Sequence, residues 1–300
     1  METKITAFLL AGCLALTGCT SKPRYHYAVR QDLGVYFENA DNVIETIRAG
    51  LVRRDGQITI QYTSHHDNLN ELSALFGELM EYALAETESP QEGDYLRYST
   101  GGDTMHSSYR TVGEAYRYTI TILPQYYTTA AQERLVSERV QAILGELDFD
   151  AKTTDYKKVQ SVYAYIREHV RYDTVHAKNA SHHRKTTAYA ALIQGQAVCQ
   201  GYAVSVYRLL REAGVNARIV TGRAGENGEF HAWNIVCIDG LYYNLDVTWD
   251  DANGNTACFL RSDADFEGHT RDAQFCSPDF TTRYPMAEQS YLFDEKGGST

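Results

Sequence analysis

Hydrophobic positions along the chain recur with two periods, which divide it into predicted helices and strands. Apolar residues at three- and four-residue steps predict helices over 41–50, 67–86, 130–147 and 155–171. Alternation of apolar and polar residues predicts strands over 56–64, 94–100, 109–123 and 216–224. The mixture of the two favours an α+β fold.

A break in this pattern separates two predicted domains. Pro124 and the polar run QYYTTAAQE, residues 125–133, have the composition of a boundary segment. Residues 31–125 are therefore predicted to form a small α+β domain that positions the domain after it. Residues 126–300 are predicted to form that larger domain.

The first nineteen residues are predicted to lie outside the fold. Their apolar run, residues 5–16, is too short to span a bilayer and is typical of an export signal. The run ends in LTGC, which resembles a bacterial lipobox and implies cleavage before Cys19 and attachment of diacylglycerol to its sulfur. Residues 1–18 are predicted to be a lipoprotein signal peptide and 19–30 a tether. We therefore expect a lipid anchor at the extracytoplasmic face of the cell membrane, with an ordinary secretory signal as the alternative.

Composition and charge narrow the classes of function. The chain is 43% hydrophobic and 22% charged, as soluble globular proteins are, and its formal net charge is -11. A chain this acidic is not expected to bind nucleic acid through charge. No C-x2-C or H-x3-H pattern occurs, so the sequence predicts neither a metal site nor a cofactor.

Four cysteines remain beyond the signal region. Cys258 and Cys276 both lie in a loop-rich tail, where a disulfide between them is conceivable in an exported protein. Cys237 lies in an apolar strand, which predicts a packed side chain. Cys199 has a different setting.

Cys199 lies at the predicted start of a helix. In QAVCQGYAVSVYRLLREAG, residues 196–214, apolar residues follow the cysteine at helical spacing and Gly214 ends the run. At a helix N-terminus the dipole and the unpaired N–H groups stabilise a thiolate. The same N–H groups can hold the oxyanion of a tetrahedral intermediate.

A polar loop over 172–185 precedes this helix. Thr186 or Thr187 can cap the short predicted helix over 188–193 that comes after the loop. His182, His183 and their basic neighbours could form a mobile lid over a site. A solvated loop is the favoured interpretation.

The segment EFHAWNIVCIDGLYYNLDVTWDD, residues 229–251, is predicted to be a long hairpin. Asp239–Gly240 is a dipeptide that the tight type I′ turn prefers, and with that turn Ile238 faces Leu241. One face of the hairpin is then apolar and fixes the register. Its residues are Ala232, Val236, Ile238, Leu241, Tyr243, Leu245 and Val247.

The same register predicts the contents of the other face. Counting outward from the turn places Trp233 opposite Asp246 and His231 opposite Thr248. His231 and Asp246 are then diagonal neighbours with Cβ atoms roughly 7 Å apart or less, within hydrogen-bonding reach of their side chains.

Cys199, His231 and Asp246 together supply a nucleophile, a base and an orienting carboxylate. A cysteine becomes a strong nucleophile when a histidine takes its proton. An aspartate at the far ring nitrogen sets the tautomer and stabilises the imidazolium. We also name Gln196, Gln200 and Trp233 as candidates for supporting the substrate or the oxyanion.

Three blocks of the sequence resemble those of the bacterial transglutaminase-like superfamily, which is related to the papain-like cysteine proteases. The blocks are AVCQGYA, HAWNIV and DGLYYNLDVTWDD, and the resemblance covers about residues 130–290. It implies a transglutaminase-like core in which Cys199 is the nucleophile, His231 the base and Asp246 the orienting group. Cys258 stands where the family pattern implies an aromatic residue, which bears on packing.

The sequence is compatible with three functions. The first, which we favour, is that of a cell-surface lipoprotein that hydrolyses peptide or isopeptide amides through a thioester on Cys199. The second is that of a transglutaminase that transfers the acyl group to an amine and cross-links proteins. The third is that of a non-catalytic lipoprotein that binds peptides. All three predict a peptide or protein partner, and the sequence leaves the substrate and the oligomeric state open.

Overall fold

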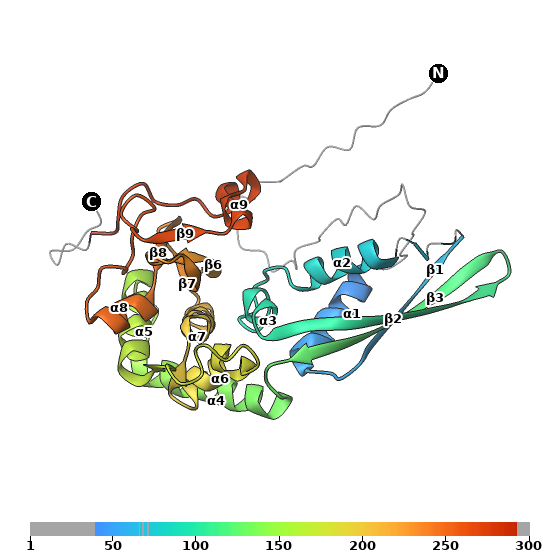
Figure 1. The fold of residues 1–300 in the computed structure, drawn as a ribbon, viewed down its shortest axis with the longest axis horizontal. Helices are drawn as coiled ribbons and strands as arrows, with labels where there is room; N and C mark the ends of the chain where they lie inside the picture. Colours follow the sequence, from blue (N-terminus) through green and yellow to red (C-terminus); the bar gives the residue numbers. More distant parts are fainter. Residues whose placement is uncertain (1–39, 66, 68, 71, 293–300) are drawn as a thin grey trace, which may run out of the picture.

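The computed structural model describes residues 40–292 apart from 66, 68 and 71. Its helices and strands form two neighbouring units, an N-terminal unit of residues 40–126 and a C-terminal unit of residues 130–292 (Figure 1). Each has its own hydrophobic core. The predicted limits of the signal peptide, tether and domains reach outside the described residues and stay a prediction.

The N-terminal unit packs two helices against a three-stranded antiparallel sheet of order β1-β3-β2. Strand β1 alternates strictly between buried and exposed residues, as its sequence pattern predicted. Strands β2 and β3 continue as a long hairpin (Figure 1). The elements are α1 (Ala40–Arg53), β1 (Ile58–Ser64), α2 (Leu72–Ala83), α3 (Asp94–Arg97), β2 (Thr100–Val112) and β3 (Ala115–Tyr126).

The strand predicted over 94–100 is wrong, because residues 94–97 form the helical turn α3 and β2 begins at Thr100. The reason is tertiary. The buried Asp94 carboxylate accepts a bidentate pair of bonds from Arg218 at 2.7 and 3.0 Å and a third from the Ile219 backbone N–H at 2.7 Å. These bonds hold α3 against the C-terminal unit. An extended strand over the same residues would move the Asp94 carboxylate away from Arg218 and Ile219.

The C-terminal unit places a helix on one face of a four-stranded antiparallel sheet of order β8-β7-β6-β9. Its first elements are α4 (Ala130–Leu147), α5 (Asp155–His169), β4 (Arg171–Tyr172), η2 (His183–Thr186), α6 (Ala188–Leu192), β5 (Gln196–Ala197) and α7 (Cys199–Glu212). The remaining ones are β6 (Ala217–Ala224), β7 (Glu229–Ile238), β8 (Leu241–Leu245), α8 (Val247–Asn253), β9 (His269–Arg271), η3 (Ala273–Cys276) and α9 (Pro278–Arg283).

Both faces of this sheet are buried. The predicted apolar face packs against α7 in the main core through residues that include Ala232 and Val236, whereas Leu241 at the turn is exposed. The opposite face, with Trp233 and Ile235, packs against the segment 258–286. The sheet is therefore a middle layer, and the face predicted to carry the site is a second core.

Polar contacts join the two units beside α7. The Tyr207 hydroxyl donates to Glu86 at 2.8 Å, and the Gln200 amide donates to the carbonyl of Tyr98 at 3.1 Å. The N-terminal unit thus contacts the helix that begins with Cys199.

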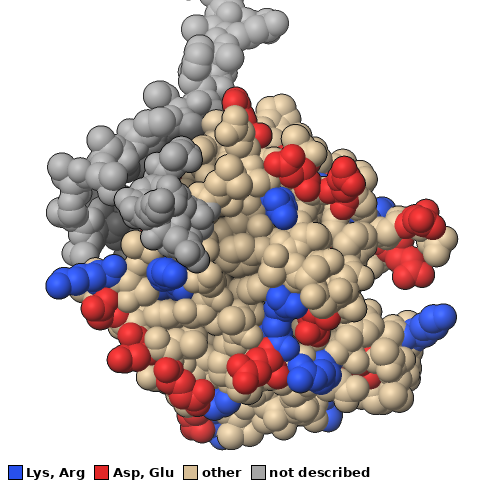
Figure 2. Space-filling model, turned by 90° about the vertical axis from the view of Figure 1, so that its left-hand side faces the viewer, with Lys and Arg blue, Asp and Glu red and all other residues tan. Residues whose placement is uncertain are grey.

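Two further observations concern the surface and the membrane. Figure 2 shows a face of the molecule on which acidic and basic side chains are interspersed among uncharged ones. None of the helices among the described residues is long and apolar enough to cross a membrane. Cys19 and the predicted signal peptide lie outside the described residues.

Candidate active site

Cys199 is the first residue of α7, as the sequence predicted, and its side chain is buried. The strand before it is fixed by backbone bonds: the Asp173 N–H donates to the carbonyl of Ala197 at 2.8 Å, and the Val198 N–H donates to the carbonyl of Lys185 at 3.0 Å. These bonds set the angle at which the chain enters the helix. The sulfur therefore lies where the helix dipole and the free N–H groups of the first turn favour negative charge.

Gly201 allows the chain to turn tightly into the helix. A Cβ atom at that position would lie 2.6 Å from the Ala197 side chain and 2.8 Å from the Lys185 carbonyl oxygen. The first turn of α7 consequently packs directly on the chain that leads into it. The glycine in CQGYA thus has a packing role next to Cys199.

The hairpin after α7 has the predicted turn and register. Asp239 and Gly240 both have positive φ, 53° and 85°, as a type I′ turn requires. Ile238 faces Leu241, and the ladder continues without a shift to the pair Asn234 and Leu245.

Beyond Leu245 the prediction of an extended strand is wrong. Asp246 caps α8, because its Oδ1 accepts the Trp249 backbone N–H at 3.1 Å. Thr248 is consequently helical and does not lie opposite His231. The sequence DVTW carried the signal for this change, since aspartate three residues before a free N–H is a preferred N-cap.

His231 and Asp246 nevertheless meet as predicted. His231 lies on β7, paired with Gly222 of β6, and its Nε2 is 2.7 Å from Asp246 Oδ2. The side chains are 8% and 1% exposed. Nε2 is taken by the carboxylate, so Nδ1 is the nitrogen left for the thiol of Cys199.

The electrostatics of the pair favour a charged imidazole. Burial lowers the pKa of His231, but hydrogen bonding to Asp246 and then to Cys199 outweighs it and raises the pKa to about 10. Burial likewise opposes ionisation of Asp246, yet bonds from His231 and then His269 hold the pKa of its carboxyl below the usual value. An imidazolium between a thiol and a carboxylate is the arrangement that sustains a thiolate.

His269 is the residue that sequence reasoning missed. Its Nε2 lies 2.9 Å from the same Asp246 Oδ2, and its side chain is 1% exposed. It belongs to the short edge strand β9, 23 residues beyond Asp246, and nothing in GHTRD alone indicates a site. His231, Asp246 and His269 are called the buried cluster below.

The three candidates for supporting roles lie in different settings. Trp233 is buried, stacks near His231 with ring centroids 6.1 Å apart, and donates from Nε1 to Asn244 at 3.2 Å. Gln200 is engaged with Tyr98, and Gln196 is exposed on β5. Trp233 is thus the candidate that the structure brings beside the buried cluster, whereas no contact among the described residues assigns an oxyanion role to either glutamine.

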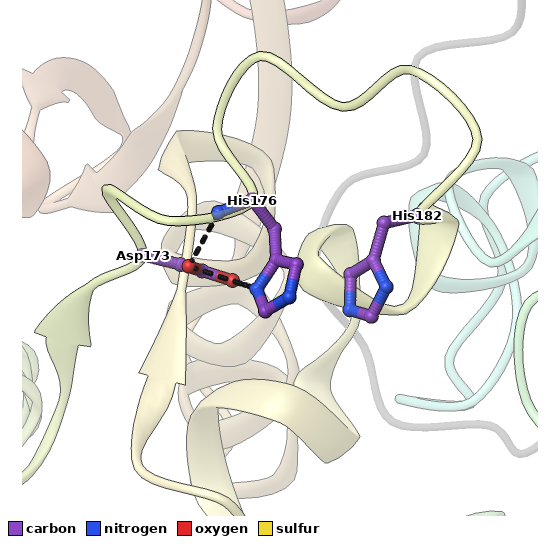
Figure 3. Close-up of side chains that lie close together, drawn as sticks. All are labelled: Asp173, His176 and His182. Atoms are coloured by element: carbon purple, nitrogen blue, oxygen red, sulfur yellow. Dashed lines mark hydrogen bonds and ion pairs between the residues drawn. The ribbon is translucent and has the colours of Figure 1, made fainter.

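The loop between β4 and η2 carries a second group of two histidines and an aspartate, the loop cluster of Asp173, His176 and His182 (Figure 3). Asp173 accepts from the His176 backbone N–H at 2.9 Å and lies 2.9 Å from its Nδ1. His182 stacks on His176 with centroids 4.1 Å apart and planes at 16°.

Both clusters bring together groups that can ligate a metal, which their spacing in the sequence does not reveal. In the loop cluster the stacked rings hold their in-plane lone pairs side by side, so one ring must turn before both could bind one ion. In the buried cluster both imidazoles bond to a single carboxylate oxygen. As they stand, the loop cluster joins residues of one loop by hydrogen bonds and ring stacking, and the buried cluster is a hydrogen-bond network.

The disulfide considered between Cys258 and Cys276 is not formed. Both are free thiols, Cys258 buried and Cys276 exposed. Cys258 packs in the core behind the sheet, where its backbone N–H donates to Asp250 at 2.8 Å. Cys237 is also free and packs at the edge of that core, as expected.

Comparison with known proteins supports the fold. Residues 146–247 match the model of the transglutaminase-like superfamily, about a third of the chain. Kyphoscoliosis peptidase of Homo sapiens is 32% identical over 107 residues, 32% of this chain and 16% of that protein. The mouse protein of the same name is 28% identical over 131 residues, 40% of this chain and 19% of that one.

A solved structure described as a TGase is 18% identical, with a TM-score of 0.33 over 48% of this chain and 44% of its own. The chain spans less than a fifth of the length of the two curated relatives. The family match covers α5 to β8 with Cys199, His231 and Asp246 inside it. It supports the expected transglutaminase-like core, and the structure shows the α+β fold of that core and of the small unit before it.

Proposed function

We propose that this protein hydrolyses peptide or isopeptide amides through a thioester on Cys199. The observation that carries the proposal is the His231 imidazole, whose Nε2 lies 2.7 Å from Asp246 while hydrogen bonding to Cys199 contributes to its raised pKa. Burying an ion pair costs desolvation free energy. Groups whose pKa values are strongly shifted in this way are concentrated at functional sites. The name of the human relative, a peptidase, is consistent with hydrolysis.

The reaction uses groups of this chain in two stages. The Cys199 thiolate attacks the carbonyl carbon of the amide, and the resulting oxyanion accepts hydrogen bonds from N–H groups at the start of α7. The His231 imidazolium gives its Nδ1 proton to the leaving amine, and the C–N bond breaks to leave a thioester. Neutral His231 then takes a proton from water as the oxygen of that water attacks the thioester. The C–S bond breaks to release a carboxylic acid, and the Cys199 thiolate is restored beside the His231 imidazolium.

The alternative outcome, transfer to an amine, differs only in what resolves the thioester. An acyl-enzyme formed from a peptide library, trapped on Cys199 and sequenced, identifies the acyl donor. Addition of a primary amine to the turnover reaction then distinguishes the two outcomes. Hydrolysis gives free acid as the main product at millimolar amine, whereas predominant amide product would identify a cross-linking enzyme.

A decisive test of catalysis as such is labelling of Cys199 by iodoacetamide at neutral pH. We expect stoichiometric labelling faster than that of a free thiol, and its loss in His231→Ala. Labelling at the rate of a free thiol, unchanged in His231→Ala, would instead identify a non-catalytic binding protein.

We further propose that the protein acts at the cell surface on a lipid anchor at Cys19. The LTGC junction supports this location. Intact-mass spectrometry of the mature protein is expected to show a chain that begins at a diacylated Cys19. Retention of Met1 or an unmodified Cys19 contradicts the proposal.

A further inference from the structure

We propose that His269 is a positioning residue, whose imidazolium holds the buried Asp246 carboxylate ionised and oriented toward His231. The proposal rests on the proposed function, because it assigns His269 to the support of the Cys199–His231 pair. It extends the predicted trio to a fourth member.

The hydrogen-bond partners of His269 determine its charge. Its Nδ1 lies 3.0 Å from the backbone carbonyl oxygen of Glu267, a group that can only accept. Its Nε2 lies 2.9 Å from Asp246 Oδ2, which accepts when ionised. Both nitrogens must carry a proton to make both bonds, so the arrangement selects the imidazolium form of His269.

The surroundings of the ring suit a buried cation. The Phe266 ring stacks on it with centroids 4.0 Å apart and planes at 22°, and the centroids of the Trp249 and Trp233 rings lie at 4.3 and 5.2 Å. Aromatic faces attract a cation, and here they also exclude water from it. Asp246 is then the counter-charge that offsets its burial.

The backbone is built to bring β9 to this place. At Gly222 a Cβ atom would lie 2.0 Å from the Thr270 carbonyl oxygen, so only glycine allows β6 and β9 to approach as they do. Gly268 has a φ of +75°, in the left-handed region, immediately before the histidine. Two glycines far apart in the sequence thus serve the position of one side chain.

The consequence is a buried row of alternating charge. With His269 present, the order thiolate, imidazolium, carboxylate, imidazolium runs from Cys199 to His269 and sums to zero. Asp246 Oδ1 is already held by the Trp249 N–H, so the two imidazoles share Oδ2. Loss of His269 would leave one negative charge uncompensated and one face of Oδ2 without a donor. His231 on β7 and His269 on β9 are the groups whose hydrogen bonds lower the pKa of the Asp246 carboxyl.

The test compares His269→Phe, which keeps a ring in the aromatic setting, with His269→Gln, whose amide can donate to Asp246 without a charge. His106→Gln is the matched control, since His106 is exposed on β2 of the N-terminal unit, outside the buried cluster. The readout is the rate of Cys199 labelling by iodoacetamide between pH 5 and 9 in folded protein. We expect about a tenfold or greater loss near pH 6 in His269→Phe, partial rescue in His269→Gln and no change in the control.

A second readout is independent of reactivity. NMR of protein with 15N-labelled histidine is expected to show two protonated ring nitrogens on His269 at neutral pH, one of them changed by Asp246→Asn. A neutral His269, or a wild-type labelling profile in His269→Phe, overturns the proposal. If wild-type Cys199 reacts like a free thiol while the NMR signature is present, the proposed function fails but the placement of His269 stands.

Discussion

The buried cluster and the loop cluster contain the same groups, two imidazoles and a carboxylate, in opposite arrangements. In the buried cluster the side chains of Asp246 and His269 are 1% exposed, and both histidines bond to one oxygen. In the loop cluster the His176 side chain is 42% exposed, and His182 stacks on the His176 ring. Among the described residues, the structure shows no hydrogen bond from His182 to the Asp173 carboxylate. The same residue types therefore form a network of charged groups in the buried cluster and a local contact within one loop in the loop cluster.

Both carboxylates are buried, and the difference lies in the exposure of their histidines. Away from water an ionised Asp246 depends on its two histidines, so each of them has a large effect on the others. Asp173 also has hydrogen bonds from the backbone and ring of His176, and these hold the pKa of its carboxyl below the usual value although burial opposes them. The half-exposed histidines beside it can be solvated, so the loss of one should matter little. Four predictions test this contrast.

The largest expected effect is on reactivity at Cys199. Cys199→Ala removes the sulfur that forms the thioester and should abolish turnover. His231→Gln should reduce turnover by roughly 10³-fold or more. Asp246→Asn should be milder, since the imidazole remains but loses orientation and charge. The matched change Asp173→Asn should stay within about threefold, and equal losses in the two aspartate variants would remove the contrast.

The next effect concerns stability. Asp246→Ala should lower the free energy of unfolding by about 3–5 kcal/mol, because it leaves two buried histidines without the carboxylate that they bond to. Asp173→Ala should cost about 1 kcal/mol, the typical net value of a hydrogen bond, because water can solvate the half-exposed His176 that loses its partner. Urea unfolding followed by tryptophan fluorescence measures both, since the two tryptophans of the chain, Trp233 and Trp249, lie beside the buried cluster. Similar values for the two variants would contradict the assignment.

The third effect is a pH dependence of stability. The pKa of His231 is raised from 6.5 to about 10 in the folded protein, so its contribution is complete below pH 6.5 and is lost as pH rises toward 10. The lowered pKa of Asp246 acts in reverse, and its contribution is lost as pH falls below the ordinary value of 3.8. His231→Gln should flatten the alkaline limb of unfolding free energy against pH, and His182→Gln should leave it unchanged. An alkaline limb that persists in His231→Gln belongs to other groups.

The smallest effect is expected in the loop. His182→Ala removes one stacked ring and should cost about 0.5 kcal/mol. Labelling of Cys199 should not change, but trypsin should cleave after Lys178 faster as the loop opens. A tenfold loss of labelling in this variant would show instead that the loop acts on the site.

The sequence alone predicted most elements, because period and capping are local properties. Helix α7, the turn at Asp239–Gly240 and the register of β7 with β8 follow from residues close together in the chain. So does the approach of His231 to Asp246, since a hairpin of fixed register places both. The α+β class and the resemblance to the transglutaminase-like superfamily needed no more than these blocks.

Only the tertiary structure decided the rest. Asp94 bonds to a strand 124 residues away, and that bond makes a helix of a segment whose alternation favours a strand. His269 reaches Asp246 because β9 pairs with β6, and no local pattern gives the order of strands in a sheet. The two histidine clusters likewise differ in what covers them, and burial is set by packing across the whole chain. Local sequence determines which groups exist and how a hairpin aligns, whereas packing determines which of them lose water and depend on one another.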